Sequence, residues 1–273
     1  MKFKRAWTGN WENAFHGLRH PMESYTRSDS DFGIGDCDAW LESCRHEVAY
    51  SYCPEGHEDE NWEEINEWLA KNGELRFGKY AGEYAYIGKN DLDLAQRMIK
   101  AGTPNDKFLR QIFVSVDITA PLYIWKELDT YKIGTTANST STMHKLASTP
   151  ITLDCFEIGD FNSDLEFTGW EFKNSTNNLI KGLEILRQKY LETKDIRYWK
   201  ELIRWLPESW LQTRTWTANY AVLRNVVHWR KNHKLKYEWD SFIQWCKTLP
   251  YAEELIFYNN GYDKEYELHN LLS

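Results

Sequence analysis

The sequence predicts a mixed α/β (α+β) fold, because strand-like and helix-like patterns of apolar residues both occur in it. Apolar residues alternate from Ile112 to Ile118, as in a strand with one buried face. Residues 174–193 carry apolar residues at helical spacing, which predicts a long amphipathic helix. A β-like run at 213–217 leads directly into a helical pattern at 219–231.

Further helices are predicted on both sides of the 112–118 strand. One begins at about Asn90, a residue that can cap it, and stops at Gly102. Another begins at Pro121 and runs to about Tyr131. The remaining predicted helices cover residues 60–71, 195–205, 238–248 and 252–258.

Length and composition exclude several classes of protein. A chain of 273 residues can bury a full core in one domain, with room for a sizeable insertion. The formal net charge of −8 argues against binding duplex nucleic acid through its phosphates. The mean hydropathy of −0.67 argues against a membrane span, and the basic N-terminus lacks the apolar stretch of a secretory signal. Five irregularly spaced cysteines fit a reducing compartment, so we expect a cytoplasmic protein.

Three polar residues share the helix predicted after the 213–217 strand: Asn219, Asn225 and Arg230. Positions eleven apart return to nearly the same face of a helix, so we expect Asn219 and Arg230 to point the same way. Asn225 is expected about a third of a turn away. Amides and a fixed cation suit a flat polar ring such as a pyrimidine or a flavin. The alternative is a surface helix with solvated amides and an Arg favoured by the helix dipole.

The segment 130–145 is rich in hydroxyl groups and has no acidic residue. Hydroxyls and backbone N–H groups can surround a phosphate, and Lys132 or Lys145 would add charge. An ordinary Ser/Thr-rich surface loop has the same composition. Composition therefore leaves both interpretations open.

The C-terminal part of the chain resembles the signature of the flavin-dependent thymidylate synthases (the ThyX family). The matching residues are Leu206-Pro207, Thr213-Arg214, Thr217-x-Asn219, Leu223, Asn225 and Arg230. Upstream and in the same order, residues 90–102 resemble the helix before the family's first active-site loop, and 112–121 resemble its core strand. Residues 125–145 occupy the place of its central motif, so the likeness covers residues 90–258.

The chain departs from the family in this central motif, which usually runs Arg-His-Arg, two residues, Ser, one residue, Asn, two residues, Ser, one residue, Arg. Thr130 and Tyr131 replace the first Arg and the His, whereas Lys132 keeps the third basic position. The hydroxyl–Asn–hydroxyl order is kept by Thr135, Asn138 and Ser141. Replacing Arg by Thr removes a permanent charge and a bidentate fork. The chain thus resembles a divergent branch of the family.

The resemblance implies a central, mostly antiparallel sheet flanked by helices, and a homotetramer with FAD sites between subunits. It implies one-carbon transfer to C5 of dUMP, giving dTMP, with methylenetetrahydrofolate as carbon donor and NADPH as reductant. Because of the motif changes, a hydroxymethylated product or UMP as substrate stays open. A protein that keeps the fold and binds nucleotide or flavin without catalysis is a further alternative.

The resemblance also assigns roles to individual residues. Arg230 would bind the uracil ring and draw negative charge onto it, which makes it the catalytic residue. The flavin would be bound by Asn219, Asn225, Thr130, Tyr131 and Lys132. Besides Arg230, the nucleotide would be bound by Glu127, Asn138, Ser139, Ser141 and Lys145. We expect Lys132, Ser139, Ser141 and Lys145 to take over the phosphate from the missing arginines, because they are the polar cluster of suitable sign left in the matching segment.

Residues 30–88 have no clear counterpart in compact members of the family, so we predict a single domain over residues 1–273 with an insertion at 30–88. The insertion is acidic and contains Cys37, Cys44, Cys53 and His57. Their spacing does not match the usual paired zinc ligands, so we expect a helical appendage with buried thiols and no metal site.

Overall fold

The computed structural model describes residues 1–34, 83–158 and 167–260. The predicted helix at 60–71 and the residues Cys37, Cys44, Cys53 and His57 lie outside the described residues. The chain divides into two compact units. Unit 1 comprises residues 1–2, 118–130 and 137–215, and unit 2 comprises residues 3–117, 131–136 and 216–273.

The main sheet has four strands in the order β1-β4-β6-β5, and strands β4 and β6 contribute residues to both units. The strands are β1 (Lys2–Gly9), β4 (Phe113–Pro121), β5 (Thr136–Ser139) and β6 (Leu211–Asn219). The alternation predicted along β4 is confirmed, since Val114, Val116 and Ile118 are fully buried between more exposed neighbours. The predicted fold class is confirmed, because the protein combines an antiparallel sheet with flanking helices.

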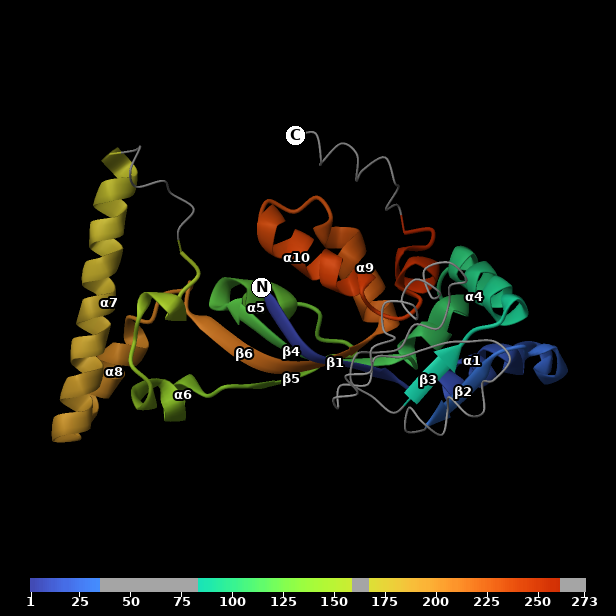
Figure 1. Cartoon of the computed structure of the whole chain (residues 1–273), viewed down its shortest axis with the longest axis horizontal. Coiled ribbons are helices and arrows are strands. Elements are labelled where there is room, and N and C mark those ends of the chain that lie inside the picture. Colours follow the sequence, from blue (N-terminus) through green and yellow to red (C-terminus); the bar gives the residue numbers. More distant parts are fainter. Residues whose placement is uncertain (35–82, 159–166, 261–273) are drawn as a thin grey trace, which may run out of the picture. The chain divides into compact units, whose positions relative to one another are not determined.

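Unit 2 holds helices from both ends of the chain. They are α1 (Trp11–Arg19), η1 (His20–Met22), η2 (Tyr25–Arg27), α4 (Lys89–Ala101), η3 (Asn105–Arg110), α9 (Tyr220–Arg230), α10 (Lys236–Lys247) and η6 (Ala252–Phe257). Figure 1 shows α9 and α10 beside each other. Tyr220 of α9 and Trp239 and Phe242 of α10 are buried. The predicted helix at 252–258 is present as the π-helix η6.

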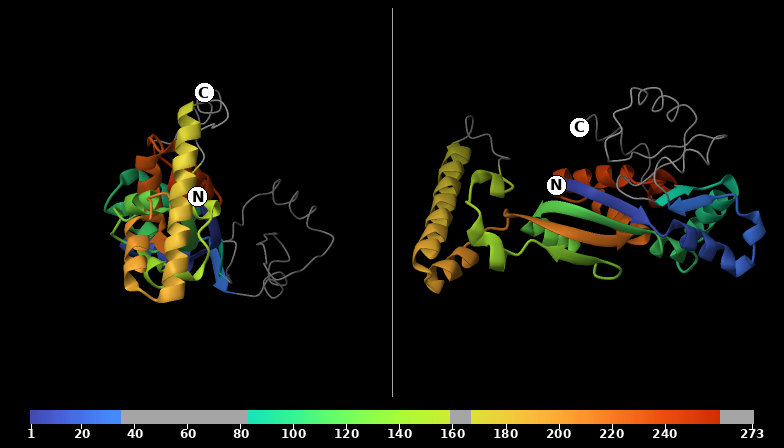
Figure 2. Two further views of the ribbon diagram at one scale, coloured as in Figure 1. Left: turned by 90° about the vertical axis from the view of Figure 1, so that its left-hand side faces the viewer. Right: turned by 60° about the horizontal axis from the view of Figure 1, so that its bottom comes forward.

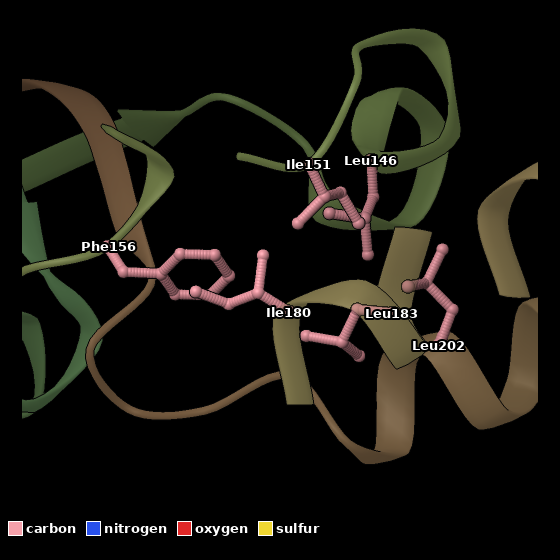
Figure 3. Packing of buried hydrophobic residues seen from close by; sticks show 6 residues of the cluster. All are labelled: Leu146, Ile151, Phe156, Ile180, Leu183 and Leu202. Carbon is pink, nitrogen blue, oxygen red and sulfur yellow. The ribbon is translucent and has the colours of Figure 1, made fainter. Parts of the chain in front are cut away.

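The helices of unit 1 are α5 (Leu122–Leu128), α6 (Thr142–Lys145), η4 (Leu146–Ser148), η5 (Leu153–Cys155), α7 (Phe167–Thr193) and α8 (Ile196–Arg204). An apolar cluster lies between η4, η5, α7 and α8. Helices α7 and α8 lie side by side in both views of Figure 2. The cluster, whose side chains point toward one another in Figure 3, consists of Leu146, Ile151, Phe156, Ile180, Leu183 and Leu202. The stripe predicted on the 174–193 helix thus anchors α7.

The predicted helix after Pro121 ends earlier than expected, at Leu128 instead of about Tyr131. The hydroxyl of Thr130 donates to the carbonyl oxygen of Glu127 at 2.7 Å, so a side chain competes with the helical backbone pattern there. The hydroxyl-rich segment that follows is also more regular than a loop, because it forms β5 and α6. The N–H of Thr140 donates to the carbonyl oxygen of Thr213 at 2.8 Å, next to β5.

Strands β2 (Asp31–Ile34) and β3 (Glu83–Tyr86) form a separate antiparallel ladder, in which Asp31 pairs with Tyr86 and Ile34 with Glu83. The chain on either side of residues 35–82 is therefore held together by backbone pairing. Within the described parts of the chain, no helix is long and apolar enough to cross a membrane.

A buried ion pair joins the end of α1 to the start of α4. Arg19 Nε donates to Asp91 Oδ1 at 2.5 Å, and the hydroxyls of Ser28 and Ser30 each donate to Asp91 Oδ2 at 2.6 Å. Burial alone would raise the pKa of Asp91, but these hydrogen bonds lower it below its ordinary value. Asp91 therefore stays ionised and ties the segment around Ser28 to the first turn of α4.

Candidate functional site

The junction of β6 and α9 places the first predicted flavin residue, Asn219. Its backbone is extended (φ −144°, ψ 169°), and its Oδ1 accepts a hydrogen bond from the Val222 N–H at 3.0 Å. Asn219 is therefore the N-cap of α9 and is only 7% exposed. Asn219 was expected inside the helix but lies one residue before it, with an extended backbone, so helical spacing does not determine its direction relative to Arg230.

A cavity of about 590 Å³ opens beside the first turns of α9, built entirely from unit 2. Its wall includes both Asn219 and Asn225, although the helical wheel had assigned them to different faces. The size lies in the range of small-molecule and cofactor sites. Two of the residues assigned to flavin thus share one cavity.

Three basic residues on the cavity wall were not foreseen: Arg110, Arg224 and His228. With Asp106 as the acidic residue of this wall, the charge balance favours an anionic ligand. His228 lies three positions after Asn225, so helical spacing could have revealed it. No sequence pattern pointed to Arg110, because it lies in η3 and only tertiary folding brings it close to α9.

Arg224 and His228 are oriented by backbone carbonyl groups of η6 and of the residues that follow it. Arg224 Nη1 donates to the carbonyl oxygens of Leu255 at 3.2 Å and Ile256 at 3.0 Å. Burial lowers the pKa of Arg224, but a guanidinium keeps its charge. The Nδ1 of His228 lies 3.2 Å from the carbonyl oxygen of Asn260, so Nδ1 carries the hydrogen of this bond.

A tight turn closes one side of the cavity. The Thr135 hydroxyl donates to the carbonyl oxygen of Tyr131 at 2.5 Å, and Gly134 at the apex has a φ of +79°. A Cβ on Gly134 would lie 2.9 Å from the Asn219 Nδ2 atom and 3.4 Å from Val222 Cγ2. Only glycine fits both this backbone conformation and this approach, so the turn rests directly on the Asn219 amide.

Arg230, at the end of α9, is held by two aromatic residues. Its Nε donates to the Tyr131 hydroxyl oxygen at 2.9 Å, and its Cζ lies 5.3 Å from the Tyr131 ring centroid. The Trp239 ring centroid lies 4.9 Å from the same Cζ. The structure therefore brings Tyr131, which stands where the family motif has His, into contact with the predicted catalytic residue.

The remaining predicted flavin residue of unit 2, Lys132, is exposed in the same turn. The other predicted site residues belong to unit 1. Thr130 and Glu127 are joined by the hydrogen bond that ends α5. Asn138 and Ser139 are exposed on β5, and Lys145 is exposed at the end of α6. Ser141 caps α6, where its Oγ accepts from the His144 N–H at 3.1 Å.

Metal and thiol chemistry find little support in the described residues. No group of three His, Cys, Asp or Glu side chains there is placed to hold a metal ion. Cys246 is fully buried, and burial raises the pKa of its thiol well above the ordinary value. A thiol of this kind is a poor nucleophile.

Comparison with known proteins identifies the fold. No protein-family model matches the chain, and neither does any curated protein sequence. A solved structure of the flavin-dependent thymidylate synthase ThyX from Helicobacter pylori, complexed with FAD and dUMP, matches with a TM-score of 0.54 at 15% identity, over 94% of this chain and 98% of that one. The chain has the ThyX fold. A second structure of that enzyme with FAD and dUMP gives the same TM-score and identity over 96% and 100% of the two chains.

A UMP/dUMP methylase, PolB from Streptomyces cacaoi, bound with 5-Br UMP, is more distant. Its TM-score is 0.45 at 14% identity, over 64% of this chain and 85% of that one. The resemblance to ThyX drawn from the sequence is thus confirmed for the fold, with a divergent sequence.

Proposed function

We propose that this protein binds FAD and transfers a one-carbon unit to C5 of a uracil nucleotide, in the manner of a flavin-dependent thymidylate synthase. One observation carries the proposal. Asn219 and Asn225, assigned to the flavin from the sequence, line a single cavity in a chain with the fold of a protein solved with FAD and dUMP.

The residues of the cavity fit a flavin. Amide groups such as those of Asn219 and Asn225 both donate and accept hydrogen bonds, as the polar edge of the isoalloxazine ring requires. Arg110 and Arg224 supply positive charge for the anionic parts of FAD, and the His228 ring adds a group that can form a hydrogen bond. The close approach of Gly134 to the Asn219 amide leaves no room for a side chain between the turn and this wall. FAD, when bound, would supply the redox chemistry that the protein itself lacks.

Arg230 would act on the uracil ring. Adding carbon at C5 needs negative charge to build up on the ring, chiefly on its carbonyl oxygens and N3, and a fixed guanidinium stabilises that charge more in the transition state than in the ground state. Tyr131 and Trp239 already fix its position. The buried Cys246 thiol is unsuited to attack the ring, which agrees with a mechanism that needs no cysteine nucleophile.

The finer assignments belong to the same proposal. Methylenetetrahydrofolate would donate the carbon, NADPH would reduce the flavin, and a homotetramer would form the complete sites. Lys132, Ser139, Ser141 and Lys145 would bind the nucleotide phosphate, with Glu127 and Asn138 near the base or sugar and Thr130 near the flavin. The chain would be one domain with an insertion at residues 30–88, whose two ends are joined by the β2–β3 ladder.

Flavin binding is tested first with Asn225→Ala. Because Asn225 is exposed on the cavity wall and does not cap α9, its loss should weaken FAD binding about 5- to 10-fold, as for one hydrogen bond, without lowering the thermal midpoint. Asn178→Ala, at an exposed position on α7, is the matched control and should bind FAD normally. A wild-type protein that is colourless and cannot be reconstituted with FAD would overturn the proposal.

Catalysis is tested by single-turnover oxidation of the reduced protein with methylenetetrahydrofolate and either dUMP or UMP. Product that carries the new carbon at C5 supports the proposal, and the preferred nucleotide identifies the substrate. The rival is a non-catalytic nucleotide- or flavin-binding protein. It is favoured by Thr130, whose hydroxyl is engaged with Glu127 where the family has an arginine. FAD binding with no turnover on either nucleotide would establish this rival.

A further inference from the structure

Arg230 is in contact with two aromatic residues. Neither the family motif nor the sequence pattern predicted that these residues would contact Arg230. Tyr131 reaches it from the turn before β5, and Trp239 from the first half of α10. The phenol oxygen accepts the Nε hydrogen at 2.9 Å, and the indole ring lies 4.9 Å from Cζ. One contact fixes an edge of the guanidinium, and the other supports the group through the negative face of a π system.

A tryptophan at position 239 is unfavourable for packing alone, so we ask whether the face of its ring has a role. Its side chain is completely buried, and its indole Nε1 has no hydrogen-bond partner among the residues that the structure describes. Burying an unpaired N–H costs free energy that a Phe or Leu would not incur. Trp is, however, the aromatic residue that attracts a cation most strongly. The ring's contact with Arg230 offers a reason for keeping an otherwise unfavourable side chain.

Tyr131 gives a complementary constraint at the position where the family motif has His. A phenol hydroxyl stays neutral at physiological pH and can always accept a hydrogen bond, so its bond to Nε does not depend on protonation. The carbonyl oxygen of Tyr131 is itself held by the Thr135 hydroxyl at 2.5 Å. The Tyr131 side chain therefore extends from a turn that is fixed at its own backbone.

We propose that Tyr131 and Trp239 are positioning residues that hold the Arg230 guanidinium in the orientation in which it polarises the uracil ring. The inference rests on the proposed function of Arg230. It adds that the phenol of Tyr131 and the indole of Trp239 fix the position of the Arg230 guanidinium in this chain. An arginine side chain has many rotamers, so the two contacts reduce the conformational freedom that would otherwise be lost on reaching the transition state.

The experiment compares Tyr131→Phe and Trp239→Phe with two matched controls. Trp245→Phe is the control for the indole, because Trp245 also lies in α10 and has an unpaired buried Nε1, but it stacks on Phe3 at 4.8 Å. Tyr237→Phe is the control for loss of a phenol hydroxyl, since Tyr237 is 75% exposed on the same helix. FAD content, nucleotide dissociation constant, single-turnover rate and thermal midpoint are measured for each.

We expect Tyr131→Phe to lower the single-turnover rate on the order of 10-fold, as for a lost hydrogen bond to a charged group, and Trp239→Phe to lower it about 3- to 10-fold. In Trp239→Phe the FAD content stays normal, and in both variants the nucleotide dissociation constant changes less than the rate per FAD-containing protein. Trp239→Phe also removes the unpaired N–H, so its thermal midpoint should match that of Trp245→Phe. Tyr131→His, which restores the residue of the family motif, should recover part of the rate because a neutral imidazole nitrogen can accept from Nε.

Wild-type rates in both Phe variants would overturn the inference, and so would an equal loss in Trp245→Phe, since that would indicate a general core effect. Failure of the proposed function is distinguishable, because then the wild-type protein itself shows no turnover. A ligand-free measurement still decides in that case. In protein labelled with ¹⁵N-arginine, the Arg230 Nε–H should exchange with solvent slowly in wild type and much faster in Tyr131→Phe. Equal exchange in the two proteins would exclude the positioning role.

Discussion

Replacing Gly134 by Ala would test whether the turn before β5 sets the position of the Asn219 amide. The φ of +79° costs an alanine about 1–2 kcal/mol. The new Cβ would lie 2.9 Å from Asn219 Nδ2, so the Asn219 amide must move. This movement weakens or breaks the 3.0 Å hydrogen bond that Asn219 Oδ1 accepts from the Val222 N–H. Loss of an N-cap costs about 1 kcal/mol. The sum, reduced by the lower entropy of an unfolded alanine, is a destabilisation of about 1–2.5 kcal/mol.

The functional consequence should be separable from this loss of stability. Gly102 also has a positive φ, of +71°, but nothing lies within 4 Å of its would-be Cβ. Gly102→Ala should therefore lose roughly 1–3 kcal/mol through backbone strain alone and keep its affinity for FAD. Gly134→Ala should in addition bind FAD about 5-fold more weakly, because one amide of the cavity is displaced. Urea unfolding gives the stabilities, and flavin fluorescence gives the dissociation constants. Equal FAD affinities in the two variants would refute the argument that the turn positions Asn219.

Three further predictions concern other parts of the chain. Arg230→Ala should keep FAD but lose about 10²–10³ in turnover. Arg230→Lys should not restore turnover, because the point charge of a lysine cannot replace the planar guanidinium fork. Wild-type turnover in Arg230→Ala would mean that the active site is misplaced. Ser141→Ala combined with Lys132→Ala should weaken nucleotide binding by roughly 1–2 kcal/mol in calorimetry, and an unchanged dissociation constant would remove both from the phosphate site. Glu184 accepts two hydrogen bonds from Arg187, which lower its pKa from 4.5 to about 2. Because the folded pKa lies below the unfolded value, the pair stabilises the fold fully above about pH 4.5 and this stability is lost as the pH falls toward 2. Glu184→Gln should therefore show a smaller decrease in urea midpoint between pH 6 and pH 3 than wild type, and equal decreases would contradict the assignment.

Elements whose burial follows a simple period could be predicted from the sequence. The alternation from Ile112 to Ile118 identified β4 because a strand buries every second residue on one face, and Val114 and Val116 are indeed fully buried. Strand β5 could not be found in this way. All four of its residues are exposed, so pairing at the edge of the sheet, and not burial, determines its conformation.

The site was predictable only in part. Asn219 and Asn225 were identified by resemblance, whereas the rotation of residues around an ideal helix misplaced Asn219, which is an extended N-cap. The contact between Gly134 and Asn219 and that between Trp239 and Arg230 join segments that are separate in the sequence. No local pattern encodes such contacts. They depend on how α9 packs against its neighbours in unit 2.

The ladder of β2 and β3 bears on how this chain can change in evolution. Its last pair, Ile34 and Glu83, faces across an antiparallel register, which is the geometry at which a two-residue hairpin turn can join two strands. The entropy of closing a loop grows slowly, by about 0.6 kcal/mol for each doubling of its length. Connections of very different length between these two positions are therefore compatible with one and the same β2–β3 register.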